Sequence, residues 1–356
     1  DARFEAWATS LLGDAFAALG VYAPGPGGPV DVAALQAATS PAHQRLLAEL
    51  LEAGVRGGLL MRGEAGALTA PSPSPFASPA FLAAEAAALA AHPATAAAAR
   101  LLAPCAAALP AVLTGKAGFA DAMFPGGSPH LVEPVYKDPL VSAPFNAQLA
   151  AAVIAFAEAT ASSAAPTAAS PVRVLEIGSG SGGTSDPVLR ALDPLAASGG
   201  RAIEFTYTDL SPALVAYGRR TYGPRHAFAT FRTLDVEGDL AAQAYPLASY
   251  DVVLATNVLH ATSDMGRTLG ACKALLRPGG LLLANELAAK TLFLTLTFGQ
   301  TAGWWAYVDP DRRVPGSPIL DAGRWVALLQ EAGFGRVAVL GSANAPARPR
   351  LLARQA

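Results

Sequence analysis

The chain has 356 residues, of which 52% are hydrophobic and 15% are charged, and its formal net charge is −2. A chain of this length and apolar content can bury one large core or two modest ones, which excludes disorder as the default state. Its near-neutral charge, without a basic stripe, argues against nucleic-acid binding driven by phosphate neutralisation.

The first part of the chain predicts a mainly helical region. Leucines within residues 42–53 have helical spacing, and residues 57–69 predict a short hairpin. The proline- and serine-rich residues 70–79 predict a linker, followed by at least three helical segments up to about Thr114. Charged residues and prolines interrupt the alanine-rich stretch at 81–109, so we expect no bilayer-spanning helix of about 20 apolar residues there.

The second part of the chain predicts alternating strands and helices. A helix at 146–159 and a loop of small residues at 159–171 come first. Short β-rich runs follow at 172–177, 203–208, 229–234, 251–256, 280–286 and 336–340, and helical segments at 185–197, 212–222, 264–276 and 322–332. This alternation predicts a doubly wound α/β domain, a parallel sheet covered on both faces whose ligands bind beyond the carboxyl ends of the strands.

The sharpest local motif is V-L-E-I-G-S-G-S-G-G-T at 174–184, at the turn from the first of these strands to the next helix. Glycines there let the backbone approach a ligand closely and leave helix N–H groups pointing at it. Taken alone the motif is ambiguous. Gly178, Gly180 and Gly183 also satisfy the dinucleotide fingerprint, with Asp209 at the end of the next strand.

Three acidic residues favour S-adenosylmethionine over a dinucleotide. Glu176 can face a cationic sulfonium and its amino group, whereas it would lie unfavourably near a pyrophosphate. Asp209 can accept hydrogen bonds from both ribose hydroxyls, and Asp235 from the adenine amino group. Each acid could instead cap the next helix, but three at successive strand ends favour the cofactor. We expect the cofactor-binding residues to be Glu176, Gly178, Gly180, Gly182, Asp209, Leu210, Asp235, Val236 and Asn257.

The order of motifs from Val174 to Leu283 resembles the Rossmann-like methyltransferase family. From about Leu101 to Phe334 the chain more narrowly resembles the methyltransferase domains of modular polyketide synthases. That likeness rests on V-L-T-G-K at 112–116, F-P-G-G-S at 124–128, V-Y-K-D-P at 135–139, F-N at 145–146, N-V-L-H-A-T at 257–262, N-E at 285–286, L-T-F-G at 296–299, G-W-W at 303–305, W-V-A-L-L at 325–329 and G-F at 333–334.

The resemblance implies a Rossmann-like, doubly wound, mostly parallel sheet over residues 146–356. It also implies a mainly helical N-terminal cap, or lid, subdomain over residues 1–145. S-adenosyl-L-methionine would be the cofactor and S-adenosyl-L-homocysteine its product. The expected partners are an acyl carrier protein bearing a phosphopantetheine-tethered polyketide and neighbouring synthase domains, in the cytoplasm, without nucleic acid or membrane. Because the chain begins at Asp1 without methionine, we expect a domain of a longer protein.

In the family that the chain resembles, a histidine after the fourth strand and a glutamate ending the fifth form a catalytic dyad, and His260 and Glu286 occupy those positions. The pairing suits the chemistry. An α-carbon or a hydroxyl still carries its proton at neutral pH, so a general base must remove that proton before methyl transfer, and a carboxylate fixes the tautomer of the imidazole that does so. Tyr136 matches a family tyrosine near cofactor and substrate, although it could instead be a packing residue at the start of a helix.

The leading functional hypothesis is C-methylation at the α-carbon of a carrier-bound β-ketoacyl thioester, and the alternative is O-methylation of a β-hydroxyl or enol oxygen. A nicotinamide-dependent oxidoreductase is disfavoured by Glu176 and by the lack of a second nucleotide-binding half. An inactive, structural domain is disfavoured by the intact glycine loop and dyad. No metal is expected, because the histidines show no ligand spacing, and Cys105 and Cys272 are interpreted as core thiols in a reducing compartment.

Overall fold

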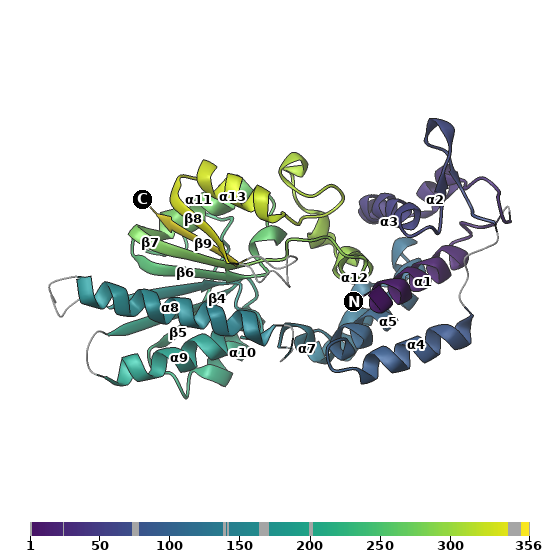
Figure 1. The fold of residues 1–356 in the computed structure, drawn as a ribbon. Helices are drawn as coiled ribbons and strands as arrows, with labels where there is room; N and C mark the ends of the chain where they lie inside the picture. The colour runs from purple at the N-terminus through teal and green to yellow at the C-terminus, as the bar shows by residue number, and fades with distance from the viewer. Residues whose placement is uncertain are drawn as a thin grey trace. The chain divides into compact units, whose positions relative to one another are not determined.

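The computed structural model describes residues 2–23, 25–72, 78–137, 140, 142–163, 171–198, 202–340 and 350–355. The chain forms two units, and it passes between them more than once. The first, the helical unit, comprises Asp1–Leu140, Lys290–Ala306 and Pro315–Ser317. The second, the sheet unit, comprises Val141–Ala289, Tyr307–Val314 and Pro318–Ala356. Figure 1 labels most of the helices of both units and most strands of the sheet unit.

The helical unit consists of short and medium helices around an apolar core. Its α-helices are α1 (Ala2–Ala18), α2 (Val32–Ala38), α3 (Gln44–Arg56), α4 (Pro79–Ala91), α5 (Ala96–Leu113), α6 (Phe119–Met123), α7 (Glu133–Tyr136) and α12 (Leu292–Leu296). Its 3₁₀ turns are η1 (Pro41–His43), η2 (Glu64–Gly66), η3 (Pro125–Gly127), η4 (Pro129–Leu131), η6 (Phe298–Gln300) and η7 (Ala302–Trp305). The antiparallel strands β1 (Met61–Arg62) and β2 (Leu68–Thr69) confirm the hairpin. Of the expected linker at 70–79, residues 73–77 lie outside the described part of the chain.

The expectation of at least three helices up to Thr114 is wrong, because residues 78–114 form two, α4 and α5. Pro104 and Pro110 lie inside α5, where each removes a backbone hydrogen bond. Burial of Leu101, Leu102 and Cys105 in the core of the helical unit offsets that loss. Among the described residues, α5 is the one helix whose length and composition would allow it to cross a bilayer.

The doubly wound, mostly parallel sheet is confirmed in the sheet unit. Its strands are β3 (Val172–Ile177), β4 (Ile203–Asp209), β5 (Ala229–Thr233), β6 (Tyr250–Thr256), β7 (Leu276–Asn285), β8 (Phe334–Leu340) and β9 (Arg350–Gln355). Over the described residues their order is β5-β4-β3-β6-β7-β9-β8. The strands from β5 to β7 are parallel, whereas β9 runs antiparallel to both β7 and β8.

Helices cover both faces of this sheet (Figure 1), with α8 (Ala143–Ser163), α9 (Ser185–Ala197) and α10 (Pro212–Tyr222) on one face and α11 (Met265–Leu275) and α13 (Ala322–Glu331) on the other. Alternate residues of β3 enter the two cores: Val172 and Val174 pack toward α8–α10, and Leu175 and Ile177 toward α11. The 3₁₀ turns η5 (Leu259–Ala261) and η8 (Pro310–Arg312) complete the unit. The loop expected at 159–171 is helical as far as Ser163, and residues 164–170 lie outside the described chain.

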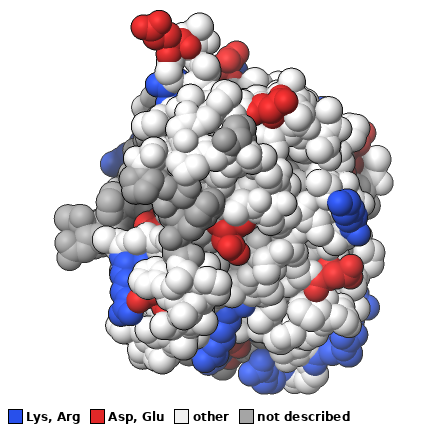
Figure 2. All heavy atoms as spheres, turned by 90° about the vertical axis from the view of Figure 1, so that its right-hand side faces the viewer, with Lys and Arg blue, Asp and Glu red and all other residues white. Residues whose placement is uncertain are grey.

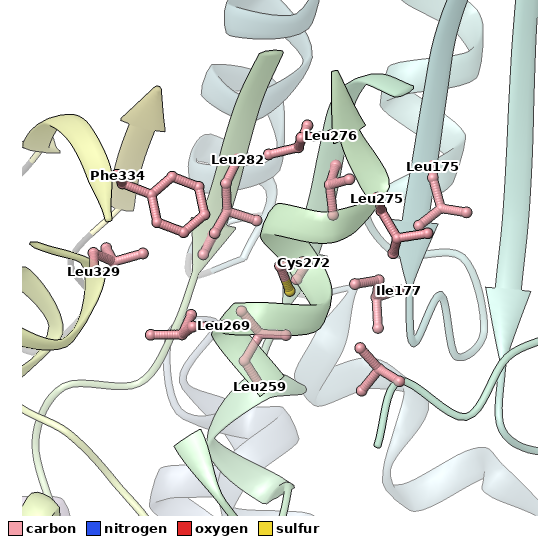
Figure 3. Close-up of a cluster of buried hydrophobic side chains, with 14 of the residues drawn as sticks. Leu175, Ile177, Leu259, Leu269, Cys272, Leu275, Leu276, Leu282, Leu329 and Phe334 are labelled. Carbon is pink, nitrogen blue, oxygen red and sulfur yellow. The ribbon is translucent and has the colours of Figure 1, made fainter. Parts of the chain in front are cut away.

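Both cysteines are free and buried, as the sequence predicts. Cys272 lies among Leu269, Leu275 and Leu282 between α11 and the sheet (Figure 3), and burial raises the pKa of its thiol to about 12. Burial likewise raises the pKa of Cys105 to about 12. The face shown in Figure 2 carries charged side chains of both signs, scattered among uncharged ones.

Candidate active site

The polar residues of interest lie along one edge of the sheet. Strands β5, β4, β3, β6 and β7 are adjacent in that order and parallel, so their carboxyl ends share this edge. The glycine loop follows β3, Asp209 ends β4, and Asp235 follows β5. Asn257 and His260 follow β6, and Glu286 follows β7. Ligands of open α/β sheets bind at such an edge.

Three of the four glycines of the loop have positive φ angles: 64° at Gly178, 58° at Gly180 and 82° at Gly182. A Cβ atom at Gly178 would collide with Val258, and one at Gly182 with the Tyr222 hydroxyl. A Cβ atom at Gly180 would have no heavy atom of any described residue within 4 Å, apart from those of its two neighbours in the chain. Packing therefore requires Gly178 and Gly182, whereas Gly180 leaves open space in which a ligand can approach the backbone.

Glu176 supplies a buried acid directly beneath this loop. It is 1% exposed, and its Oε2 accepts hydrogen bonds from the hydroxyls of Ser179, at 3.0 Å, and Ser185. Burial raises its pKa to about 7; the two serine hydroxyls oppose the rise, and nearby Asp209 adds to it. Because the two serines use the same oxygen, neither bond occupies Oε1. A cation placed there would favour the ionised carboxylate.

Asp209 connects β4 to the glycine loop. Its Oδ2 accepts a hydrogen bond from the Gly180 amide at 2.9 Å, and its Oδ1 accepts one from the Ser211 amide at 2.8 Å. The next residue, Leu210, is 70% exposed. These residues fit S-adenosylmethionine part by part. The Asp209 carboxylate suits the ribose hydroxyls, the exposed Leu210 side chain suits the adenine, and buried Glu176 suits the cationic end, with open space at Gly180 between them.

The remaining expected cofactor residues have different environments. Asp235 is exposed, and its Oδ1 accepts a hydrogen bond from the Glu237 amide at 3.0 Å. Val236 is buried in the core on the α11 face of the sheet. Asn257 has a φ of +52°, rare for a residue other than glycine, and its amide donates to the Asn285 carbonyl at 2.8 Å. Such strained conformations cluster at functional sites.

His260 and Glu286 are in direct contact. The imidazole Nδ1 lies 2.5 Å from Glu286 Oε2, and the two residues are 5% and 0% exposed. The other carboxylate oxygen, Oε1, accepts hydrogen bonds from the amides of Val258 at 3.1 Å and Leu259 at 2.9 Å. Glu286 thus holds both the ring and the turn that carries it. With Nδ1 on the carboxylate, Nε2 is the ring nitrogen that can act as a base.

Tyr136 lies in α7 of the helical unit, and its ring centroid is 6.1 Å from that of Phe298. The dyad belongs to the sheet unit, so the role expected of Tyr136 stays a prediction. Asp138 and Pro139 of the same motif lie outside the described residues.

Several residues that support the loop were not singled out as site residues from the sequence. These are Ser179 and Ser185 on Glu176, Tyr207, whose hydroxyl donates to the Gly180 carbonyl at 2.5 Å, and Asn146. The Asn146 amide donates to the Gly183 carbonyl at 3.0 Å and accepts from the Thr184 hydroxyl at 3.0 Å. Ser179 within the motif and Ser185 directly after it were the available signal, because a buried carboxylate needs nearby donors.

Within the described ranges, no three His, Cys, Asp or Glu side chains gather in a way that could hold a metal ion. Independence from metals stays a prediction.

Residues 175–282 match a family model described as a methyltransferase domain. The polyketide synthases PksM of Bacillus subtilis and ThaQ of Burkholderia thailandensis are each 40% identical to the chain, over 230 and 229 residues. The matches cover 65% and 64% of this chain but only 5% and 11% of those proteins. The crystal structure of the DszA carbon methyltransferase is 34% identical, with a TM-score of 0.91, over 99% of this chain and 89% of that one.

The chain belongs to this family of polyketide synthase carbon methyltransferases. The structure of the CurJ carbon methyltransferase is also similar to this chain, with 27% identity and a TM-score of 0.87 over 100% of this chain and 92% of that one. The family uses S-adenosylmethionine as its cofactor, and the sheet edge described above carries residues that suit it. The family expectation for fold, enzyme class and cofactor is therefore confirmed.

Proposed function

We propose that this methyltransferase domain methylates the α-carbon of a β-ketoacyl thioester tethered to an acyl carrier protein through phosphopantetheine. The observation that carries the proposal is the buried 2.5 Å contact between His260 Nδ1 and Glu286 Oε2. It lies at the ends of the adjacent parallel strands β6 and β7, on the edge of the sheet that bears the glycine loop.

The reaction needs a base, because the α-carbon between two carbonyls carries a proton at neutral pH. His260 Nε2 accepts that proton, and Glu286 stabilises the imidazolium that forms. S-adenosylmethionine supplies an electrophilic methyl group, whose carbon–sulfur bond breaks with the electron pair left on sulfur. The electron pair released at the α-carbon forms the new carbon–carbon bond, so the proton ends on His260 and charge balances.

The cofactor is held, in this proposal, by Glu176 at its cationic end, by Asp209 at the ribose and by Asp235 at the adenine amino group. Exposed Leu210 packs on the adenine, and buried Val236 contributes through its backbone. The backbone of Gly178, Gly180, Gly182 and Asn257 shapes the rest of the site. We further propose that the helical unit serves as a lid that carries Tyr136, and that neighbouring synthase domains and the carrier protein are partners.

The test is turnover of β-ketoacyl and β-hydroxyacyl carrier proteins, followed by mass spectrometry. His260→Ala should lower turnover about 10²–10⁴-fold, the usual contribution of a general base, with little change in the Kd for S-adenosylmethionine. Glu286→Gln acts through the same imidazole, so the double variant should lose far less than the product of the single losses. Tyr136→Phe, which removes only the hydroxyl, tests that residue in the same assay.

The matched control is His130→Ala, which removes an exposed histidine of the helical unit and should leave turnover unchanged. Near-wild-type turnover by His260→Ala, or a defect confined to cofactor binding, would contradict the dyad. Methylation of the β-hydroxyacyl substrate alone would replace C-methylation with O-methylation while leaving the dyad intact.

A further inference from the structure

We propose that Arg313 is a positioning residue for the base, acting on the backbone of the turn that carries His260. The inference rests on the function proposed for His260 and Glu286. Arg313 lies in the segment Tyr307–Val314 of the sheet unit and is 1% exposed. A guanidinium so deeply buried must be paired and hydrogen-bonded throughout to be tolerated.

The guanidinium binds the backbone on both sides of Ala261. Its Nη1 donates to the carbonyl of His260 at 2.6 Å, and its Nη2 donates to the carbonyl of Thr262 at 2.8 Å. Nη1 also donates to the Pro318 carbonyl at 2.8 Å. One of these acceptors belongs to the residue whose side chain is the proposed base, so Arg313 restrains the peptide from which the imidazole projects.

Asp309 completes the pairing. Its Oδ1 lies 2.5 Å from Arg313 Nε, and its Oδ2 accepts a hydrogen bond from the Met265 amide at 2.9 Å, at the start of α11. The guanidinium carbon also lies 5.0 Å from the centre of the Tyr307 ring. The planar fork of arginine can serve Asp309 and three carbonyls together, which the point charge of lysine cannot.

Arg313 and Glu286 bind opposite kinds of backbone group in the turn that carries His260. Glu286 takes the amides of Val258 and Leu259 and the His260 ring, whereas Arg313 takes the carbonyls of His260 and Thr262. A 3₁₀ turn as short as η5 leaves most of its backbone groups without partners inside the turn. A carboxylate at its donors and a guanidinium at its acceptors therefore fix the orientation on which the 2.5 Å contact between Nδ1 and Oε2 depends.

A purely structural arginine would lower stability but leave kcat of the folded protein unchanged. Two variants separate these roles. Arg313→Lys keeps the charge beside Asp309 but loses the fork, and Arg313→Met with Asp309→Leu removes both buried charges, so that neither is left unpaired. The matched control is Arg312→Gln, which removes the neighbouring arginine and its exposed pair with Glu331.

Both variants should stay folded by circular dichroism and lower kcat about ten- to a hundredfold, because small misplacements of a catalytic group cost rates of this order. The KM for the carrier-bound substrate and the Kd for S-adenosylmethionine should change little. In a His260→Ala background the same substitutions should lower kcat by less than about twofold, because the imidazole that Arg313 positions is absent. In proton NMR, the downfield imidazole N–H signal of the His260–Glu286 contact should shift or broaden in both variants but not in Arg312→Gln.

Unchanged kcat and an unchanged imidazole signal in either folded variant would overturn the positioning role. So would an effect of undiminished size in the His260→Ala background. If His260→Ala itself turned over at the wild-type rate, the dyad would fail, and the role of Arg313 with it. That result is distinct, because it appears before Arg313 is changed.

Discussion

Glu176 gives a test in which cofactor affinity and fold stability should move in opposite directions. Its pKa rises from 4.5 to about 7, which corresponds to about 3 kcal/mol in favour of the protonated acid within the fold. Because the folded-state pKa lies above the unfolded one, the stabilising contribution is complete below about pH 4.5 and is lost as pH rises through about 7. Glu176→Gln cannot ionise, so above about pH 7 its ligand-free fold should be the more stable, by up to about 3 kcal/mol.

Cofactor binding should follow the opposite sign. The ionised carboxylate attracts a cation and the protonated acid does not, so the wild-type affinity for S-adenosylmethionine should rise with pH up to a plateau above about 7. Below that value it should fall by as much as about tenfold per pH unit. At the plateau, Glu176→Gln loses one charge-assisted interaction of about 1.5–3 kcal/mol, or about ten- to a hundredfold in affinity.

Titration calorimetry across this range, in buffers of different ionisation enthalpy, measures both the affinity and the proton released on binding. Thermal unfolding of the ligand-free proteins over the same range gives the stability comparison. Wild-type affinity that does not change with pH would refute the proposed contact with the cationic end. A pH dependence that persists unchanged in Glu176→Gln would assign the titration to another group.

The other predictions concern the same edge of the sheet. Asp209→Ala should weaken S-adenosylmethionine binding about ten- to a hundredfold by calorimetry. The control is Asp193→Ala, which removes a carboxylate of α9 that pairs with His226 and should leave the affinity unchanged. Gly182→Ala should lower the unfolding midpoint more than Gly180→Ala does, because both positions have a positive φ but only the Cβ at 182 would also overlap Tyr222. Gly180→Ala should in addition weaken cofactor binding, because its Cβ would enter the open space beside the backbone. EDTA should leave turnover unchanged; a loss restored by added magnesium would contradict independence from metals.

Much of the sheet unit was predictable because its signals are local. The helices α9 and α10 begin and end at the expected residues, since the glycine loop and the Ser211–Pro212 pair mark their starts. Strands β3 and β6 are mainly apolar runs buried on both faces, a pattern that the sequence reveals well. Strand β9 was missed: its sequence, R-L-L-A-R-Q, shows neither strict alternation nor a continuous apolar run, and its antiparallel pairing with β7 and β8 is non-local.

The helical unit was harder to predict, because its structure depends on contacts between residues far apart in the sequence. Prolines at 104 and 110 predict helix ends, yet tertiary burial keeps α5 continuous. Residues 290–306 gave no local sign that they join this unit, because that membership rests on long-range contacts such as Lys290 with Glu49, at 2.8 Å, and the Gln300 amide with the Cys105 carbonyl, at 2.8 Å. Local patterns carry no information about contacts of this kind.

The dyad depends on the same long-range organisation. Glu286 follows β7, and four residues later, at Lys290, the chain enters the helical unit. It re-enters the sheet unit at Tyr307, and the returning segment supplies Asp309 and Arg313, which bind the loop of His260. Two strand ends place His260, the proposed base, beside Glu286. A third segment, separated from His260 by about fifty residues of sequence, restrains the backbone of the turn that carries His260. The geometry of the proposed active site is thus a property of three segments, which is why motif spacing alone predicts the dyad but not what holds it in place.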